Sequence, residues 1–305
     1  MRQSSRTHRS RTVTAVMTAA ALLAAGGALA GCDATPSTDG RRSGAPARPA
    51  PRPTPVWDRS PNSLAAVGDS ITRGFDACMV FADCPEVSWA TGTDNTVRSL
   101  ALRLLGERAV TTHSWNFARS GAHVAELPEQ MTRAAAKKPE LVTVMVGAND
   151  ACADTVDRMT PVDDFRASFV TSLARLRRGA PKAHVYVSSV PDLKRLWSTG
   201  RSDPLGSQIW RLGICATMLG DANDLSTTAQ ERRESVHRRV MAYNKVLKDV
   251  CGKDLRCRYD GGAVFNYRFE GEQLSRWDWF HPSRDGQQRL AEIAYRNVTA
   301  ARPPG

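Results

Sequence analysis

The sequence predicts an α/β fold, a three-layer α/β/α sandwich in which a parallel sheet lies between two layers of helices. Four short apolar runs bounded by turn-forming residues are expected to be strands, at residues 63–67, 114–118, 141–146 and 183–190. Their continuous apolar character is typical of strands buried on both faces. Segments with helical periodicity separate these runs. Alternating strands and helices favour a parallel sheet whose strand carboxyl ends meet at one edge.

Helices are expected between and after the strands, near residues 97–104, 165–176, 229–250 and 282–298. The first two repeat apolar side chains at intervals of three and four residues, which places those side chains on one helix face. Thr160 is the expected N-cap of the second helix, because Pro161 follows in the first turn and Asp163 stands three residues beyond Thr160.

The segment at residues 191–225 is too long and too apolar for a plain connection. We expect it to pack over the strand edge as an insertion beside the substrate. The same apolar side chains could equally form an outlying part of the core.

Composition limits the class of protein. Of 305 residues, 41% are hydrophobic, which is enough for a core and excludes a wholly disordered or fibrous chain. The net charge of +11 is concentrated at the amino terminus, where the first 59 residues hold nine arginines and three aspartates and leave 33 basic and 28 acidic residues for the rest. We therefore expect an ordinary solvated surface and no nucleic-acid partner.

The amino terminus has the pattern of an export signal. Four arginines within residues 2–11 precede a charge-free stretch at 12–30, which fits the positive and apolar regions of a signal peptide. The sequence LAGC at 29–32 resembles the lipobox of bacterial lipoproteins, which implies a signal peptide over 1–31 and a lipid on Cys32. We expect an extracytoplasmic protein anchored to the cell membrane through Cys32. The alternatives are an uncleaved anchor and ordinary cleavage, which would leave a secreted protein.

A proline-rich segment follows the signal. Residues 32–61 carry seven of the chain's 17 prolines, together with Gly, Ser, Thr, Ala and Arg. Such a segment buries too little apolar surface to offset its ordering entropy, so it is predicted to be a tether. The folded domain is expected over residues 62–301.

Polar motifs follow three of the predicted strands, and a fourth lies near the carboxyl terminus. The sequence GDSIT places Ser70 directly after the first strand, SG after the second contains Gly121, and GAND after the third contains Asn149. The sequence DWFHP contains Asp278 and His281. Because α/β sheets bind ligands at the carboxyl ends of their strands, these residues are expected to meet there.

A serine hydroxyl attacks a carbonyl only when a base takes its proton, and histidine is that base at neutral pH. Of six histidines, His281 has a carboxylate, Asp278, three residues before it, and His123 near Gly121 is the rival. A carboxylate beside the imidazole fixes its tautomer and stabilises the imidazolium. Ser70, His281 and Asp278 are therefore the predicted catalytic triad.

Together, the four motifs resemble the SGNH, or GDSL-type, serine hydrolase family over residues 64–298. The resemblance implies a flavodoxin-like parallel sheet and an oxyanion hole formed by the backbone N–H groups of Ser70 and Gly121 and the side-chain amide of Asn149. It also implies ester hydrolysis without a metal or an organic cofactor. Ile71 stands where many members carry Leu. Asn149 alone could equally be a turn residue or a cap.

Residues beside these motifs have less defined roles. Gly68 and Asp150 are expected to shape turns, and Asp69 to begin a helix or support the site without taking part in catalysis. Trp277 and Trp279 bracket Asp278 and either line the acyl pocket or pack in the core.

Six cysteines remain beyond Cys32, and an even number in an exported domain favours disulfides. An equal separation of six residues suggests the pairs Cys78–Cys84 and Cys251–Cys257, which leaves Cys152 for Cys215. A zinc site is not expected, because the sequence has no Cys-x-x-Cys pair.

The sequence thus predicts a serine esterase or lipase whose substrate is an acyl lipid or an acylated sugar. A polysaccharide O-acetylesterase and an acyltransferase could use the same triad. A ligand-binding lipoprotein without activity is the alternative of another class, but a binder has no need of Ser70, Gly121, Asn149, Asp278 and His281 together.

Overall fold

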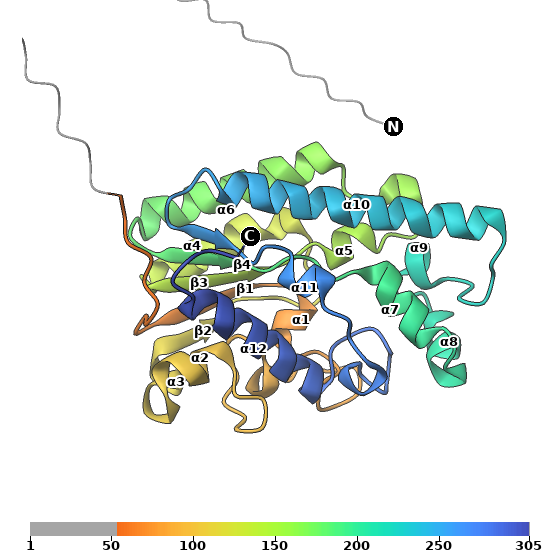
Figure 1. Ribbon diagram of the computed structural model, residues 1–305, viewed down its shortest axis with the longest axis horizontal. Coiled ribbons are helices and arrows are strands. Elements are labelled where there is room, and N and C mark those ends of the chain that lie inside the picture. Colours follow the sequence, from red (N-terminus) through yellow and green to blue (C-terminus); the bar gives the residue numbers. More distant parts are fainter. Residues whose placement is uncertain (1–53, 305) are drawn as a thin grey trace, which may run out of the picture. The chain divides into compact units, whose positions relative to one another are not determined.

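A five-stranded sheet is the centre of the structure, a computed structural model that describes residues 54–304 (Figure 1). The strands are β1 (Leu64–Gly68), β2 (Ser114–Asn116), β3 (Leu141–Met145), β4 (His184–Val187) and β5 (Cys257–Tyr259). Their order is β2-β1-β3-β4-β5, and each of these neighbouring pairs is parallel. The expected signal peptide, the lipobox with Cys32 and the tether up to residue 53 lie outside the described residues.

The parallel sheet predicted from the apolar runs is confirmed, and each of the four predicted strands begins within one residue of the observed one. β5 was missed, because it has three residues and carries the charged Arg258 at its centre. Arg258 is buried in spite of its charge, because its guanidinium donates to the carbonyl oxygens of Asn297 and Ala300, both at 2.8 Å.

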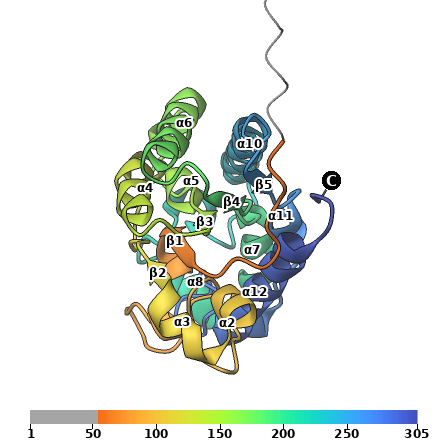
Figure 2. The same ribbon diagram turned by 90° about the vertical axis from the view of Figure 1, so that its left-hand side faces the viewer.

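Two layers of helices cover the two faces of the sheet, as Figure 2 shows. One layer contains α4 (Leu127–Ala136), α6 (Val162–Gly179) and α10 (Thr227–Cys251), and the other contains α2 (Leu100–Leu105), α3 (Glu107–His113) and α12 (Arg284–Thr299). Side chains along each strand alternate between two apolar cores. In β3, Val142 and Val144 belong to the first core, and Leu141 and Met145 to the second. The three-layer sandwich is therefore confirmed.

Short helices occupy the connections. They are α1 (Ser70–Arg73), α5 (Ala148–Ala151), α7 (Leu193–Gly200), α8 (Pro204–Trp210), α9 (Ala216–Leu219) and α11 (Ala263–Asn266), with 3-10 turns at Pro85–Val87, Val124–Glu126, Val156–Arg158 and Gly271–Gln273. Within residues 54–304, no helix combines the length and apolar content needed to cross a membrane.

Two helix starts differ from the expectation. α6 begins at Val162, and Thr160 makes no cap, because its hydroxyl donates to the Asp150 carboxylate at 2.8 Å. The prediction of Thr160 as the N-cap is therefore wrong. α2 begins at Leu100, because Ser99 caps it by accepting a hydrogen bond from the Leu102 N–H at 3.0 Å.

The last residues of the predicted tether belong to the folded domain. Trp57 packs against the second core, and its indole N–H donates to the carbonyl oxygen of Val298 at 2.8 Å. Its ring also meets the edge of His184 and lies under the guanidinium of Arg258. The folded domain thus begins before residue 62, because Trp57 packs against the second core. The proline-rich composition around Trp57 does not predict this packing.

Candidate active site

Ser70 lies at the junction of β1 and α1. Gly68 ends the strand with φ of +145°, and a Cβ there would lie 2.0 Å from the Met145 carbonyl oxygen, so the position requires glycine. Asp69 caps α1, with its Oδ1 accepting a hydrogen bond from the Ile71 N–H at 3.0 Å. The helix-start interpretation of Asp69 is confirmed. The turn leaves Ser70 at the carboxyl edge of the sheet.

His281 joins Ser70 to Asp278. The Ser70 hydroxyl donates to His281 Nε2 at 2.8 Å, and His281 Nδ1 donates to Asp278 Oδ2 at 2.5 Å. The loop 278–281 folds back on itself, because Asp278 Oδ1 accepts the backbone N–H groups of Phe280 and His281 at 2.9 and 3.0 Å. The structure therefore brings together the three residues predicted as a triad.

The Asp278 carboxylate is wholly buried, which by itself would raise its pKa. The hydrogen bond from His281, the charge of that residue and the two backbone donors outweigh burial, and the pKa of Asp278 is lowered. The carboxylate accordingly stays ionised and can support a positive imidazole.

Asn149 and Gly121 lie on adjoining loops at the same edge. Asn149 is in α5, after β3, and its side-chain amide donates to the Ala122 carbonyl oxygen at 3.0 Å. Gly121 lies in the turn after β2 with φ of +77°, and the N–H of Arg119 in that turn donates to the Gly68 carbonyl oxygen at 3.2 Å. One amide proton of Asn149 thus fixes the side chain to the neighbouring loop, and the second is left for another acceptor.

His123, the rival base, belongs to a different group of contacts. Its Nδ1 lies 3.8 Å from Asp150 Oδ1, and its side chain is about half exposed. The interaction with Asp150 raises the pKa of His123. Asp150 also accepts the Val124 N–H at 3.0 Å and the Thr160 hydroxyl, so this pair organises the loops behind Asn149.

One residue beside the triad was missed in the sequence. Asp76 is fully buried, and its carboxylate oxygen lies within 4.8 Å of ligand atoms of both Asp278 and His281. Its Oδ1 accepts the Phe81 N–H. Burial, and then the hydrogen-bonding and charge interactions with Asp278, raise the pKa of Asp76 to about 6. The sequence around Asp76 did not indicate a functional residue, because a single acidic residue outside any motif is usually exposed at the surface.

The same three residues are close enough to hold a metal ion, as are Cys78, Cys84 and Glu86. In the second group both sulfurs are in a disulfide and are not thiolate ligands. In the first, the Asp278 and His281 atoms bond each other. Two of the three ligand atoms in this group are therefore already engaged with each other.

The predicted disulfides Cys78–Cys84, Cys152–Cys215 and Cys251–Cys257 all form. Cys152–Cys215 fastens the loop of Asn149 to the 191–225 insertion, which contains α7, α8 and α9. Thr217 adds a hydrogen bond to the Ala151 carbonyl oxygen at 3.0 Å. The indole N–H of Trp210, a buried side chain, donates to the Asp278 carbonyl oxygen at 2.9 Å. The insertion thus holds both the Asn149 loop and the Asp278 loop.

Residues 64–294 match the profile of the GDSL-like lipase/acylhydrolase family. The chain belongs to this family. It is accordingly a carboxylic ester hydrolase. No curated protein sequence matches it.

Solved structures with a similar fold are distant from this GDSL-like hydrolase. A catalytic mutant of an acetylxylan esterase from Geobacillus stearothermophilus shares 18% identity over 80% of this chain and 96% of its own, with a TM-score of 0.49. A family two carbohydrate esterase from Clostridium thermocellum, in complex with cellohexaose, shares 16% identity over 81% of this chain and 65% of its own, with a TM-score of 0.45.

In this GDSL-like hydrolase, a small apolar cavity of about 20 Å³ adjoins the motifs. Its lining includes sequence neighbours of the site residues, Ile71, Ala148, Phe280 and Pro282, and Leu193 and Leu196 of the insertion. The insertion therefore lies beside the strand edge. Its buried residues Leu193, Trp210, Met218 and Leu219 belong to the first apolar core, so the alternative of a core contribution holds for them, and a position beside the substrate stays a prediction.

Trp277 and Trp279 line another pocket, of about 550 Å³, whose lining includes Asp76 but neither Ser70 nor His281. The Trp279 ring packs on the backbone of α8, where a Cβ at Gly206 would lie 2.9 Å from it. For Trp279 the core-packing interpretation therefore holds.

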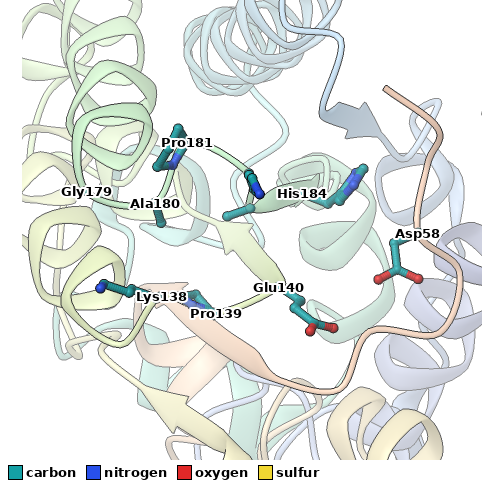
Figure 3. Close-up of a pocket in the computed structure, with 10 residues that line it drawn as sticks. Asp58, Lys138, Pro139, Glu140, Gly179, Ala180, Pro181 and His184 are labelled. Carbon is teal, nitrogen blue, oxygen red and sulfur yellow. The ribbon is translucent and has the colours of Figure 1, made fainter. Parts of the chain in front are cut away.

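A further pocket of about 550 Å³ lies at the opposite edge of the sheet, at the amino ends of β3 and β4 (Figure 3). Its lining includes Asp58, Lys138, Glu140, Lys182 and His184. None of its lining residues is a serine.

Proposed function

We propose that this GDSL-like hydrolase is a serine esterase that works by acyl transfer through Ser70, His281 and Asp278. The observation that carries the proposal is the unbroken chain of hydrogen bonds from the Ser70 hydroxyl through the imidazole to the buried carboxylate. His281 takes the proton as Ser70 attacks an ester carbonyl, and returns it to the leaving alcohol. Water then releases the acyl group by the same route.

Negative charge forms on the carbonyl oxygen during the attack, so donors have to face it in advance. We assign this role to the backbone N–H groups of Ser70 and Gly121 and to the free amide proton of Asn149. The bond from Asn149 to Ala122 supports the assignment, because it fixes the orientation of the amide before substrate binds.

The substrate is proposed to be an acyl ester, either a lipid or an acylated sugar. The apolar residues around the motifs, Leu193 and Leu196 of the insertion among them, support an acyl group. A panel of short- and long-chain acyl esters, run with and without a sugar acceptor, separates an esterase or lipase from an O-acetylesterase and from an acyltransferase.

Ser70→Ala tests the mechanism. The variant is expected to lose ester turnover and covalent labelling by an organophosphonate, because no other hydroxyl bonds His281 Nε2 among residues 54–304. Turnover or His281-dependent labelling that persists in Ser70→Ala contradicts the proposal. Unchanged circular dichroism establishes that the variant is folded.

We also propose an extracytoplasmic location with a lipid on Cys32. Three disulfides support the extracytoplasmic location, because such bonds persist in oxidising compartments. Cells grown with an alkyne fatty acid are expected to label the wild type and not Cys32→Ser. Equal labelling of both proteins contradicts the anchor.

A further inference from the structure

Asp76 lies against the triad from a segment that the mechanism does not use. It follows Phe75, whose ring lies 4.9 Å from the His281 ring, and it precedes the loop closed by Cys78–Cys84. Its backbone N–H donates to the Ala82 carbonyl oxygen at 3.0 Å, and its Oδ1 accepts the Phe81 N–H. The backbone holds Asp76 at φ of +56°, an uncommon conformation for aspartate. The loop thus fixes this carboxyl group against Asp278.

The two carboxyl groups have unequal hydrogen-bond partners. Asp278 accepts three N–H groups, from Phe280 and from the backbone and ring of His281. Asp76 accepts one, and its buried Oδ2 has no protein donor within residues 54–304. A buried, ionised oxygen without a donor is costly, and two carboxylates within 4.8 Å repel each other. One proton between them removes both costs, and Asp278, which has more hydrogen-bond donors, keeps the charge.

We propose that Asp76 is a positioning residue whose protonated Oδ2 donates a hydrogen bond to the Asp278 carboxylate. The proposal rests on the proposed triad and adds a fourth member behind it. In this arrangement Asp278 is held from two sides, by His281 and by Asp76. The proton stays on Asp76 throughout the reaction, and the buried pair carries a single negative charge.

Other charged groups surround Asp76 and bear on its ionisation. Polar atoms of Asp278 and His281 lie within 4.8 Å of its carboxylate, and the pocket that Asp76 lines also contains Glu272, Arg276, Arg284 and Asp285. The four pocket residues supply two positive and two negative charges at the surface. Their opposing fields leave Asp278 and His281 as the main influences on Asp76.

Two substitutions test whether residue 76 acts on Asp278 as a hydrogen-bond donor or as a negative charge. Asp76→Asn keeps an acceptor for Phe81 and presents an N–H toward Asp278, which copies the protonated acid. Asp76→Ala leaves Asp278 without this donor, and kcat/KM is expected to fall roughly thirtyfold at pH 6 and below, as for a lost hydrogen bond to a charged group. Asp76→Asn is expected to recover most of that loss. Glu86→Gln is the matched control, since Glu86 is an exposed acid in the same segment.

Two readouts identify the proton itself. The infrared spectrum of the wild type at pH 5 is expected to contain a carboxylic-acid carbonyl band, shifted in D₂O, that is missing from Asp76→Asn. The ratio of kcat/KM of Asp76→Asn to that of the wild type is expected to rise with pH, because only the wild type has this proton to lose.

The proposal is overturned if the band is missing from the difference spectrum or if Asp76→Asn is as impaired as Asp76→Ala. The infrared measurement needs no turnover, so it decides the matter even if Asp76→Ala does not fold. Ser70→Ala is assayed alongside. If Ser70→Ala retains activity, the triad has failed, whereas inactive Ser70→Ala with no Asp76 band refutes the present inference alone.

Discussion

The two edges of the central sheet carry similar residues in different states. At the carboxyl edge, Ser70, Asp278 and His281 are buried and bond one another, although Ser70 and His281 are 211 residues apart. At the amino edge, a pocket of about 550 Å³ contains acids, lysines and His184. There Glu140 is exposed and bonds Asn62, and the buried His184 Nδ1 has no partner within residues 54–304.

This contrast separates the proposed active site from an ordinary polar pocket. Chemistry requires polar groups that are desolvated and held by one another, because electrostatic interactions strengthen when water is excluded. A large pocket alone does not provide such groups. Among residues 54–304, the amino edge has a pocket but lacks a network of buried polar side chains that hydrogen-bond one another. The following variants test whether activity resides at one edge alone.

A matched pair of histidines gives the largest expected difference. His281→Ala removes the proposed base, and kcat/KM is expected to fall by roughly a millionfold, the scale seen when a triad loses its histidine. His184→Ala, at the amino edge, is expected to change kcat/KM by less than about twofold. Steady-state kinetics on one ester measure both, and a large loss in His184→Ala would break the contrast.

The carboxyl edge is expected to reduce stability as well as to supply activity. Burial raises the pKa of Asp69 to about 7, from an ordinary value of 3.8. The folded protein therefore binds a proton that the unfolded chain releases, and the free energy of unfolding falls as pH rises from about 4 to about 7. Asp69→Asn removes this component and keeps an acceptor for Ile71.

Denaturant unfolding at pH 4 and pH 8 measures the effect of Asp69→Asn. The variant is expected to gain stability relative to the wild type between these values, by at most about 4 kcal/mol for a shift of three units. Parallel curves for the two proteins would show that Asp69 does not titrate differently on folding.

Asn149→Ala removes the proposed side-chain donor. We expect kcat to fall on the order of a hundred- to a thousandfold with little change in KM, because the donor acts in the transition state. Asn62→Ala, at the amino edge, is the matched control and is expected to keep its kcat. Equal values for the two variants would exclude Asn149 from the oxyanion hole.

The disulfides sharpen the comparison with a smaller effect. Replacing Cys152 and Cys215 together by Ser releases the insertion from the Asn149 loop, so kcat/KM is expected to fall about tenfold through looser positioning. The double replacement of Cys251 and Cys257, at β5, is expected to lower the melting temperature and leave kcat/KM unchanged. Ester assays and thermal melts of the two double variants measure these effects. Similar kcat/KM values for the two variants would show that the Cys152–Cys215 disulfide serves stability alone.

The residues that bond one another at the carboxyl edge could be predicted from the sequence, because each belongs to a short motif with its own spacing. Others could not, because their partners are distant. Asp76 is recognisable only beside Asp278, and Thr160 serves Asp150 instead of its own helix. The short strand β5 and the packing of Trp57 likewise depend on tertiary contacts that no local sequence pattern encodes.

The strand order has a practical consequence for redesign. Ser70, Gly121 and Asn149 follow the adjacent strands β1, β2 and β3, whereas the 191–225 insertion follows β4. Exchanging this insertion between relatives would therefore leave the turns that carry Ser70, Gly121 and Asn149 in place. The Cys152–Cys215 disulfide and the hydrogen bond from the Trp210 indole connect the insertion to the loops of Asn149 and Asp278, so an exchanged insertion would have to keep both.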